Sequence, residues 1–175
     1  MTPSKEVRLN PAHLQRNNQM KFVLPAVAAT ATLLSPVLAE ARQVTFETTL
    51  KPYGGNGAYV VLYVTDAAGA YKGTLWMAGG KAKYYRHLSD WQRASGGRPA
   101  EIDGITGASV GSGKTLKINL DLADAMIDAG YTIHIDTAVE DGMDNPSEVV
   151  APLASAASGK PVAGKGYVKS FTVTF

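Results

Sequence analysis

The chain has no cysteine among its 175 residues. This absence excludes a disulfide framework, a haem attached through a cysteine pair and a metal site built from thiolates. The chain also lacks a hydrophobic run long enough to cross a bilayer. Its longest apolar stretch, residues 22–34, is shorter than the ~20 residues that a membrane-spanning helix needs. We therefore expect a domain that is not embedded in a membrane and that is stabilised by its core.

The apolar stretch has the features of a secretory signal peptide. Lys21 supplies the positive charge before it, and Pro36 follows it. Next come two small-residue cleavage sites, Val37-Leu38-Ala39 and Ala39-Glu40-Ala41. The sequence therefore predicts export to the periplasm.

The start and the end of this leader each leave a choice open. Met20 directly precedes Lys21, so translation either begins there or residues 1–19 form a long basic leader. Cleavage after Ala39 or after Ala41 fits the pattern of small residues equally well. We take residues 1–39 as the leader and residues 40–175 as a single domain, a length that forms one hydrophobic core.

Removal of the leader changes the charge of the protein. The whole chain has 17 basic and 15 acidic residues. The leader holds four of the basic residues and one of the acidic ones: Lys5, Arg8, Arg16, Lys21 and Glu6. Its removal leaves residues 40–175 with 13 basic and 14 acidic residues, a net charge of −1. The calculated pI of about 8.8 therefore belongs to the leader. Without a basic stripe the mature domain is not expected to bind nucleic acid.

Most of the mature chain alternates between apolar and polar residues, which is typical of half-buried strands. Residues 59–64 are apolar at every position, which predicts a strand in the middle of a sheet. Short strands separated by turn residues favour an all-β, immunoglobulin-like β-sandwich of about seven strands. The predicted strands are residues 44–50, 59–64, 74–77, 116–122, 131–139, 149–153 and 167–175.

A seven-residue motif, Asp103-Gly104-Ile105-Thr106-Gly107-Ala108-Ser109, has the form Asp-x-x-Ser/Thr-Gly-Ala-Ser/Thr. It resembles the acceptor motif on which a periplasmic flavin transferase places flavin mononucleotide (FMN). The resemblance implies a phosphoester between FMN and the Ser109 hydroxyl, surrounded by Asp103, Thr106, Gly107 and Ala108. Small residues let a bulky donor approach the backbone, and a serine hydroxyl needs a base to activate it. That base would belong to the transferase. The alternative is a tight Gly/Ser loop between two strands.

Residues 83–93 interrupt the strand pattern. Tyr84, Leu88 and Trp91 recur at helical spacing, and Ser95-Gly96-Gly97 marks the end of the segment. We expect a short amphipathic helix here. Its aromatic rings either pack against the sheet or offer a stacking surface to a flavin.

The resemblance extends over residues 44–175. Three segments resemble the bacterial periplasmic family of domain of unknown function 2271 (DUF2271). They are Lys83-Tyr84-Tyr85-Arg86-His87-Leu88-Ser89-Asp90-Trp91, the motif ending in Ser109, and the later Ala129-Gly130-Tyr131-Thr132-Ile133. This resemblance implies an exported sandwich associated with flavin transferases and PepSY-type membrane reductases. Family members commonly have Thr at the position of Ser109, followed by Arg-Pro-Pro-Gly. This chain continues with Val110-Gly111-Ser112-Gly113 instead.

A second signature overlaps the motif. Residues 108–115 satisfy the loose P-loop form, with Ala108 replacing the first glycine. A working P-loop needs a helix after it, so that the helix end can hold phosphates. The residues after Lys114 alternate with period two, which predicts a strand and disfavours nucleotide hydrolysis. Lys114 is expected either to be solvated or to attract a flavin phosphate by its charge.

Possible metal ligands are sparse. His87 lies in the predicted helix, and His134 shares a strand face with Asp136 and Glu140, which we expect to face solvent. Residues 141–146 are rich in oxygen ligands but lack the spacing of an EF-hand, and we interpret them as a turn.

Two functions follow from these observations. The first is a periplasmic FMN-bearing electron carrier, for which the cofactor supplies the chemistry and the sandwich positions it. The second is a cofactor-free sandwich that binds or scaffolds partner proteins. Both favour a carrier or a binding protein over a stand-alone enzyme.

Overall fold

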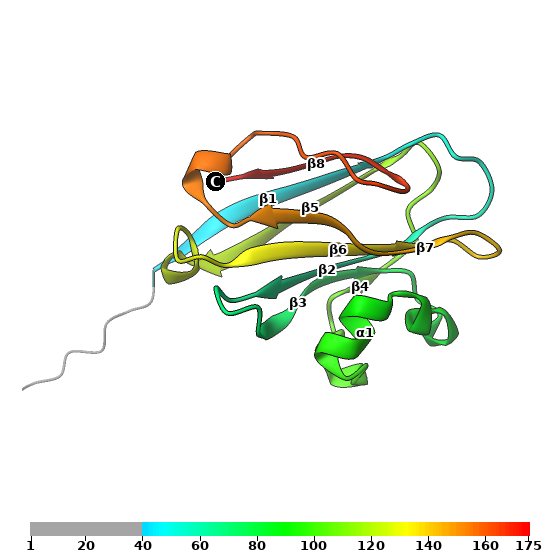
Figure 1. Ribbon diagram of the computed structural model, residues 1–175, viewed down its shortest axis with the longest axis horizontal. Coiled ribbons are helices and arrows are strands. Elements are labelled where there is room, and N and C mark those ends of the chain that lie inside the picture. Colours follow the sequence, from blue (N-terminus) through cyan, green and yellow to red (C-terminus); the bar gives the residue numbers. More distant parts are fainter. Residues whose placement is uncertain (1–39) are drawn as a thin grey trace, which may run out of the picture. The chain divides into compact units, whose positions relative to one another are not determined.

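The computed structural model describes residues 40–175, which form two facing β-sheets (Figure 1). The three-stranded sheet has the order β5-β1-β8, and the five-stranded sheet has the order β4-β3-β2-β6-β7. The strands are β1 Ala41–Leu50, β2 Tyr59–Thr65, β3 Tyr71–Ala78, β4 Thr106–Gly107, β5 Thr115–Ala123, β6 Thr132–Ala138, β7 Asp144–Pro152 and β8 Val168–Thr174. The predicted leader, residues 1–39, lies outside the described residues.

The main hydrophobic core fills the space between the two sheets. It forms because one side of each strand is apolar: Phe46 of β1, Leu62 of β2 and Ile135 of β6 are all fully buried. Burial of each such side chain stabilises the fold by about 1.5–3 kcal/mol. The predicted all-β sandwich is confirmed, with eight strands where about seven were expected.

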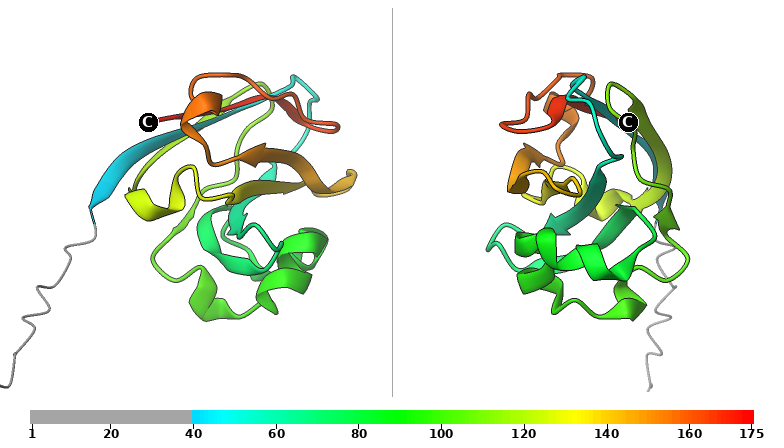
Figure 2. Two further views of the ribbon diagram at one scale, coloured as in Figure 1. Left: turned by 60° about the vertical axis from the view of Figure 1, so that its left-hand side comes forward. Right: turned by 90° about the vertical axis from the view of Figure 1, so that its right-hand side faces the viewer.

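β2 occupies the middle of the five-stranded sheet and is buried along its whole length. Its second apolar face packs against the helical segment that follows β3, as two further views show (Figure 2). Tyr59, Val61 and Tyr63 point to this outer face and contact Leu88 and Trp91. This second, smaller core explains why residues 59–64 carry no polar face.

The helical segment is divided where the sequence predicted one continuous helix. A 3-10 helix, η1, spans Ala82–His87, and the α-helix α1 spans Ser89–Ser95. Leu88 separates them with φ −90° and ψ 67°, outside helical geometry. This break lets Leu88 and Trp91 both bury their side chains against the sheet. Gly96 ends α1 in the left-handed conformation, at φ 71°, as the predicted stop signal requires.

The edge strand β7 begins earlier than predicted. It runs from Asp144 to Pro152, so the predicted turn at residues 141–146 overlaps its first three residues. Pro146 is tolerated because β7 pairs only with β6 and the edge of a sheet does not need its missing N–H.

A bulge in β8 reverses the face of its first residue. Thr49 pairs with Ser170 and Leu50 with Val168, so the register shifts by one residue between them. As a result Val168 is buried and Lys169 is exposed. Strict alternation through the predicted strand at residues 167–175 places Lys169 on the same face as the buried Phe171, and the bulge makes this prediction wrong.

The remaining helical turns are the short 3-10 segments η2 Pro99–Glu101, η3 Asp124–Met126 and η4 Ser155–Ala157. Within residues 40–175, none of the helices has the length and hydrophobicity required to traverse a bilayer.

Candidate functional site

The acceptor loop, residues 103–109, is attached to the edge of the five-stranded sheet. Its residues Thr106 and Gly107 form β4, which pairs in parallel with the end of β3. The backbone N–H of Met77 donates to the carbonyl of Ile105 at 3.0 Å, and that of Gly79 donates to the carbonyl of Gly107 at 2.8 Å. These bonds fix the loop to the scaffold, which is what a modification site on a folded domain requires.

The chain after β4 crosses to the start of β2. Ala58 and Val110 form an antiparallel bridge with hydrogen bonds of 2.7 and 2.9 Å, and both side chains are buried in the main core. Successive side chains of an extended chain point to opposite faces. Ser109 and Tyr59, the neighbours of the bridged pair, therefore lie on the outer face of the sheet. Tyr59 packs in the outer core there, and Ser109 is exposed.

Glycine keeps the Ser109 hydroxyl uncrowded. A Cβ atom on Gly57 would lie 2.6 Å from Oγ of Ser109, which is closer than real Cβ contacts. Ala108, the residue before Ser109, is small and exposed. The Ser109 side chain is therefore accessible from solvent, and the absence of a Cβ on Gly57 leaves room beside its hydroxyl.

Gly107 also has a packing role in the loop. A Cβ atom at Gly107 would lie 2.9 Å from Cζ2 of Trp76, so the missing side chain admits the indole ring. Trp76 is partly buried and packs against the main core. Gly107 thus lets the loop pack closely onto β3.

The loop is closed by Thr106 rather than by Asp103. The Thr106 hydroxyl donates to the carbonyl of Ile102 at 2.9 Å, and the N–H of Ile105 donates to the same carbonyl at 3.2 Å. Asp103 is exposed at the tip of the loop, beside Gly104 at φ +74°. The Asp103 side chain is therefore accessible at the surface, and its expected part in the acceptor motif stays a prediction.

The P-loop alternative does not fit the fold. The residues after Lys114 form the strand β5, as predicted from their alternation, so the helix end that would hold phosphates is replaced by a β-strand. Lys114 itself is exposed.

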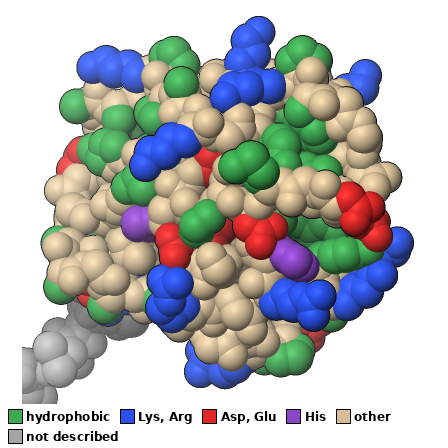
Figure 3. All heavy atoms as spheres, turned by 45° about the vertical axis from the view of Figure 1, so that its right-hand side comes forward, with side chains coloured by type: hydrophobic (Ala, Val, Ile, Leu, Met, Phe, Trp, Pro, Cys, Tyr) green, Lys and Arg blue, Asp and Glu red, His purple; other side chains and the backbone are tan. Residues whose placement is uncertain are grey.

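Charged side chains of both signs occur together on the surface of the molecule. Figure 3 shows acidic, basic and histidine side chains interspersed on the face that it displays. This mixed surface agrees with the small net charge that the sequence gives after the leader.

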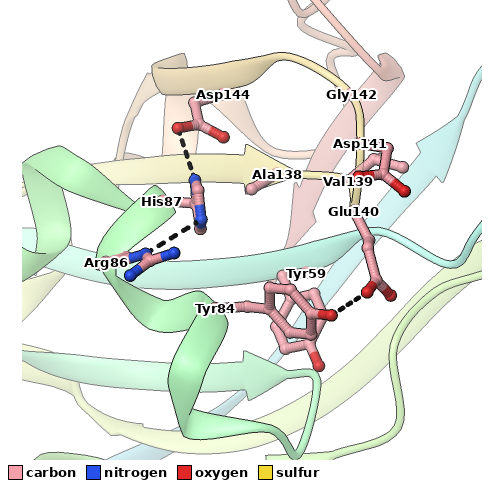
Figure 4. A pocket seen from close by; sticks show the side chains of 10 residues that line it. All are labelled: Tyr59, Tyr84, Arg86, His87, Ala138, Val139, Glu140, Asp141, Gly142 and Asp144. Carbon is pink, nitrogen blue, oxygen red and sulfur yellow. Dashed lines mark hydrogen bonds and ion pairs between the residues drawn. The ribbon is translucent and has the colours of Figure 1, made fainter.

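A pocket of about 320 Å³ lies on the outer face, between η1 and the connection from β6 to β7 (Figure 4). We call it the rim pocket. Its lining combines two aromatic rings with small apolar and charged residues: Tyr59, Tyr84, Arg86, His87, Ala138, Val139, Glu140, Asp141, Gly142 and Asp144.

Hydrogen bonds hold the walls of the rim pocket in place (Figure 4). The Tyr59 and Tyr84 rings pack with their centroids 5.2 Å apart at 53°. The Tyr84 hydroxyl donates to the Glu140 carboxylate. His87 Nδ1 and a carboxylate oxygen of Asp144 are 2.9 Å apart. Side chains from η1 are thus tied to side chains from the β6–β7 connection, so the pocket has a defined shape.

The polar face of β6 is covered, and the prediction that it meets solvent is wrong for Asp136. The Asp136 side chain is fully buried, and it lies beneath α1. The carboxylate accepts hydrogen bonds of 2.8 Å from the backbone N–H groups of Trp91 and Ser147. Burial nevertheless raises the pKa of Asp136, because desolvation outweighs these two bonds.

His134 lies on the same face and is half-buried. Its ring stacks on Tyr63 at 5.1 Å, and its Nε2 is 3.1 Å from the Thr65 hydroxyl. Desolvation lowers the pKa of His134, while the negative charges of Asp136 and Asp90 oppose the shift. Across the described residues, 40–175, no three His, Asp or Glu side chains are grouped to hold a metal ion.

The sequence motif predicted a site at residues 103–109, which stays a prediction, and it gave no indication of the rim pocket. Tyr59 belongs to a strand without a polar face, and Glu140 and Asp144 belong to a segment interpreted as strand end and turn. The sequence signal for the rim pocket was the cluster Lys83-Tyr84-Tyr85, whose aromatic rings offer a stacking surface. Which residues would face Tyr84 depends on pairing between distant strands.

Comparison with known proteins gives one family. No curated protein and no solved structure matches the chain. The model of a family described as a predicted periplasmic protein (DUF2271) matches residues 41–170. This match spans all but the ends of the sandwich and agrees with the location expected from the leader. The chain is therefore a periplasmic protein and belongs to the DUF2271 family.

Proposed function

We propose that this protein is an acceptor of covalently attached FMN and acts as an electron carrier in a membrane-linked redox chain. The observation that supports the proposal most is the position of Ser109. Its side chain is exposed on the outer face at the edge of the sheet, and the absence of a side chain on Gly57 leaves room beside its hydroxyl. A transferase can reach such a hydroxyl without unfolding the domain.

Attachment needs one bond to form and one to break. Oγ of Ser109 attacks the FMN phosphorus of a flavin dinucleotide, and the pyrophosphate bond breaks to release AMP. A base on the transferase accepts the proton of the serine hydroxyl. Asp103, exposed at the tip of the same loop, would be recognised by the transferase as part of the motif.

The bound FMN would supply one-electron and two-electron transfer. The residues of the chain would hold it at the surface, where a PepSY-type membrane reductase and a periplasmic acceptor can approach. Met77 and Gly79 of the β3 edge hold the loop that carries it, through their bonds to Ile105 and Gly107.

Intact-mass measurement after co-expression with a flavin transferase tests this proposal. We expect an increment of one FMN less one water in the wild type and none in Ser109→Ala. Ser112→Ala is the matched control, because Ser112 lies in the same connection and its hydroxyl accepts a hydrogen bond from Gly54 at 2.8 Å. It should keep the increment. A wild type without any increment, and native protein without flavin absorbance, would contradict the proposal.

A second candidate, a cofactor-free binding module, is favoured by the edge strand β7. Val150 on this strand is 49% exposed, and Met143 just before it is 71% exposed. An unpaired edge with exposed apolar side chains can accept a strand from a partner. Loss of partner binding in Val150→Lys, with no flavin on Ser109, would support this function instead.

A further inference from the structure

We propose that the isoalloxazine ring of the FMN carried by Ser109 docks in the rim pocket, against the rings of Tyr59 and Tyr84. This inference rests on the proposed function, and it assigns a ring-binding subsite to residues outside the acceptor motif. The pocket would then determine how far the flavin is shielded from water and which edge it presents to a partner.

The first support is that Ser109 and the pocket share one face of the sheet. Ser109 lies beside Tyr59 across the bridge between Ala58 and Val110, and both side chains point to the outer face. Tyr59 is a wall of the rim pocket. The ribityl chain of FMN therefore starts next to the pocket and does not have to cross a sheet edge to enter it.

The second support is a direct backbone link between the loop and the pocket wall. The N–H of Gly79 donates to the carbonyl of Gly107 at 2.8 Å. The Tyr59 ring lies over Gly79 so closely that a Cβ atom there would be 2.1 Å from its Cδ1. The acceptor loop and the aromatic wall are thus held by the same residue, which fixes their relative position.

The third support is the chemistry of the lining. A flavin ring has an apolar dimethylbenzene end and a polar pyrimidine end with both donors and acceptors. The pocket offers Tyr59, Tyr84 and Ala138 to the apolar part, while Arg86 and Glu140 offer a donor and an acceptor. His87, Asp141 and Asp144 add further polar groups to the lining, so the pocket is mixed in character, as the ring is. Its volume of about 320 Å³ lies in the range of small-molecule sites, which begins at about 300 Å³.

The side chains are already ordered for such a ligand. The Tyr84 hydroxyl is bonded to Glu140 and the His87 ring to Asp144. The Nε of Arg86 donates to Nε2 of His87 at 3.3 Å. Ordered walls reduce the entropy that binding would otherwise cost.

The test uses lumiflavin, which has the ring but neither the ribityl chain nor the phosphate. It is titrated into unmodified Ser109→Ala protein, so that the result does not depend on esterification. We expect saturable quenching of lumiflavin fluorescence, because a tyrosine ring in contact with a flavin quenches it. Adding Tyr84→Leu should weaken binding at least tenfold, whereas Tyr84→Phe, which keeps the ring, should not.

Tyr131→Leu is the matched control. Tyr131 is also partly buried, but it precedes Thr132, which pairs with Thr65 at the opposite end of β2 from Tyr59. This change should leave binding of lumiflavin unaltered. A second measurement needs no pocket variant: ring-current shifts of tyrosine resonances on addition of lumiflavin should affect Tyr59 and Tyr84 and spare Tyr131.

Absence of saturable quenching and of these shifts would overturn the inference. Equal loss of binding in Tyr84→Leu and Tyr131→Leu would also overturn it, since the effect would then be general. The intact mass separates this outcome from failure of the proposed function. If FMN is attached to Ser109 but lumiflavin does not bind in the pocket, the proposed carrier function stands and the proposed ring-binding subsite fails.

Discussion

A carboxylate oxygen of Asp136, on the central part of β6, lies 2.8 Å from the backbone nitrogen of Trp91 in α1. Trp91 is in the first turn of this helix, where backbone N–H groups have no acceptor within the helix. The residue at the N-cap, Leu88, makes no side-chain cap. Asp136 therefore caps α1 from another element and ties the helix to the sheet that it covers.

The substitution Asp136→Asn should destabilise the protein by about 2 kcal/mol, although it conserves shape. One carboxylate oxygen accepts from Trp91 and the other from Ser147, so the amide nitrogen of Asn must face one of these donors. Urea unfolding measures the change in the free energy of unfolding. Asp121→Asn, at an exposed position of β5, is the control and should change it by less than about 0.5 kcal/mol. Equal stability of the two variants would show that the cap contributes nothing.

Glu148 should tolerate the same kind of change better than Asp136 does. It is buried, and a single oxygen, Oε1, accepts from the backbone N–H groups of Gly166 at 2.9 Å and Val168 at 2.5 Å. Its other oxygen accepts from the Thr137 hydroxyl, which can instead accept from an amide. Glu148→Gln should therefore cost less than about 1 kcal/mol, and Glu148→Ala about 2–4 kcal/mol. Thermal unfolding of both variants checks this order, and a costly Glu148→Gln would contradict it.

His134 should titrate below its ordinary value of 6.5. The unfolded chain then takes up the proton first as the pH falls, so His134 contributes stability that is present above 6.5 and lost as the pH falls through the lower folded-state pKa. NMR titration of the imidazole measures that pKa. In Asp90→Asn it should fall further, because a negative charge that favours the protonated ring is removed. A midpoint at or above 6.5 would mean that these charges outweigh desolvation.

Gly57→Ala should slow attachment of FMN to Ser109 roughly tenfold, equivalent to about 1.4 kcal/mol in the barrier. The added Cβ would lie 2.6 Å from the attacking oxygen and would displace it or cover it. The time course of the mass increment measures the rate. Gly80→Ala is the control, since a Cβ there meets nothing within 4 Å. If both variants react at the wild-type rate, access to the hydroxyl does not limit the reaction.

Local sequence patterns predicted much of the fold. Alternation assigned the buried faces of β1 and β5 correctly, and the uniformly apolar residues 59–64 indicated a central strand. Residues 115–122 were also predicted to form a strand in place of a P-loop helix, and they lie in β5. These predictions succeed because a strand's period is a property of neighbouring positions in the chain.

The patterns failed where distant segments decide the outcome. Period two placed His134 and Asp136 on one face of a strand, but only the docking of α1 determines that this face is covered. A bulge opposite β1 made Val168 the buried residue in place of Lys169. The sequence by itself determined which residues share a face in the regular strands β1 and β5. The tertiary structure decided what covers each face, and it brought the Tyr59 ring against the Tyr84 ring. Contacts between remote segments follow from how the sheets and helices pack and are not encoded in the spacing along one segment.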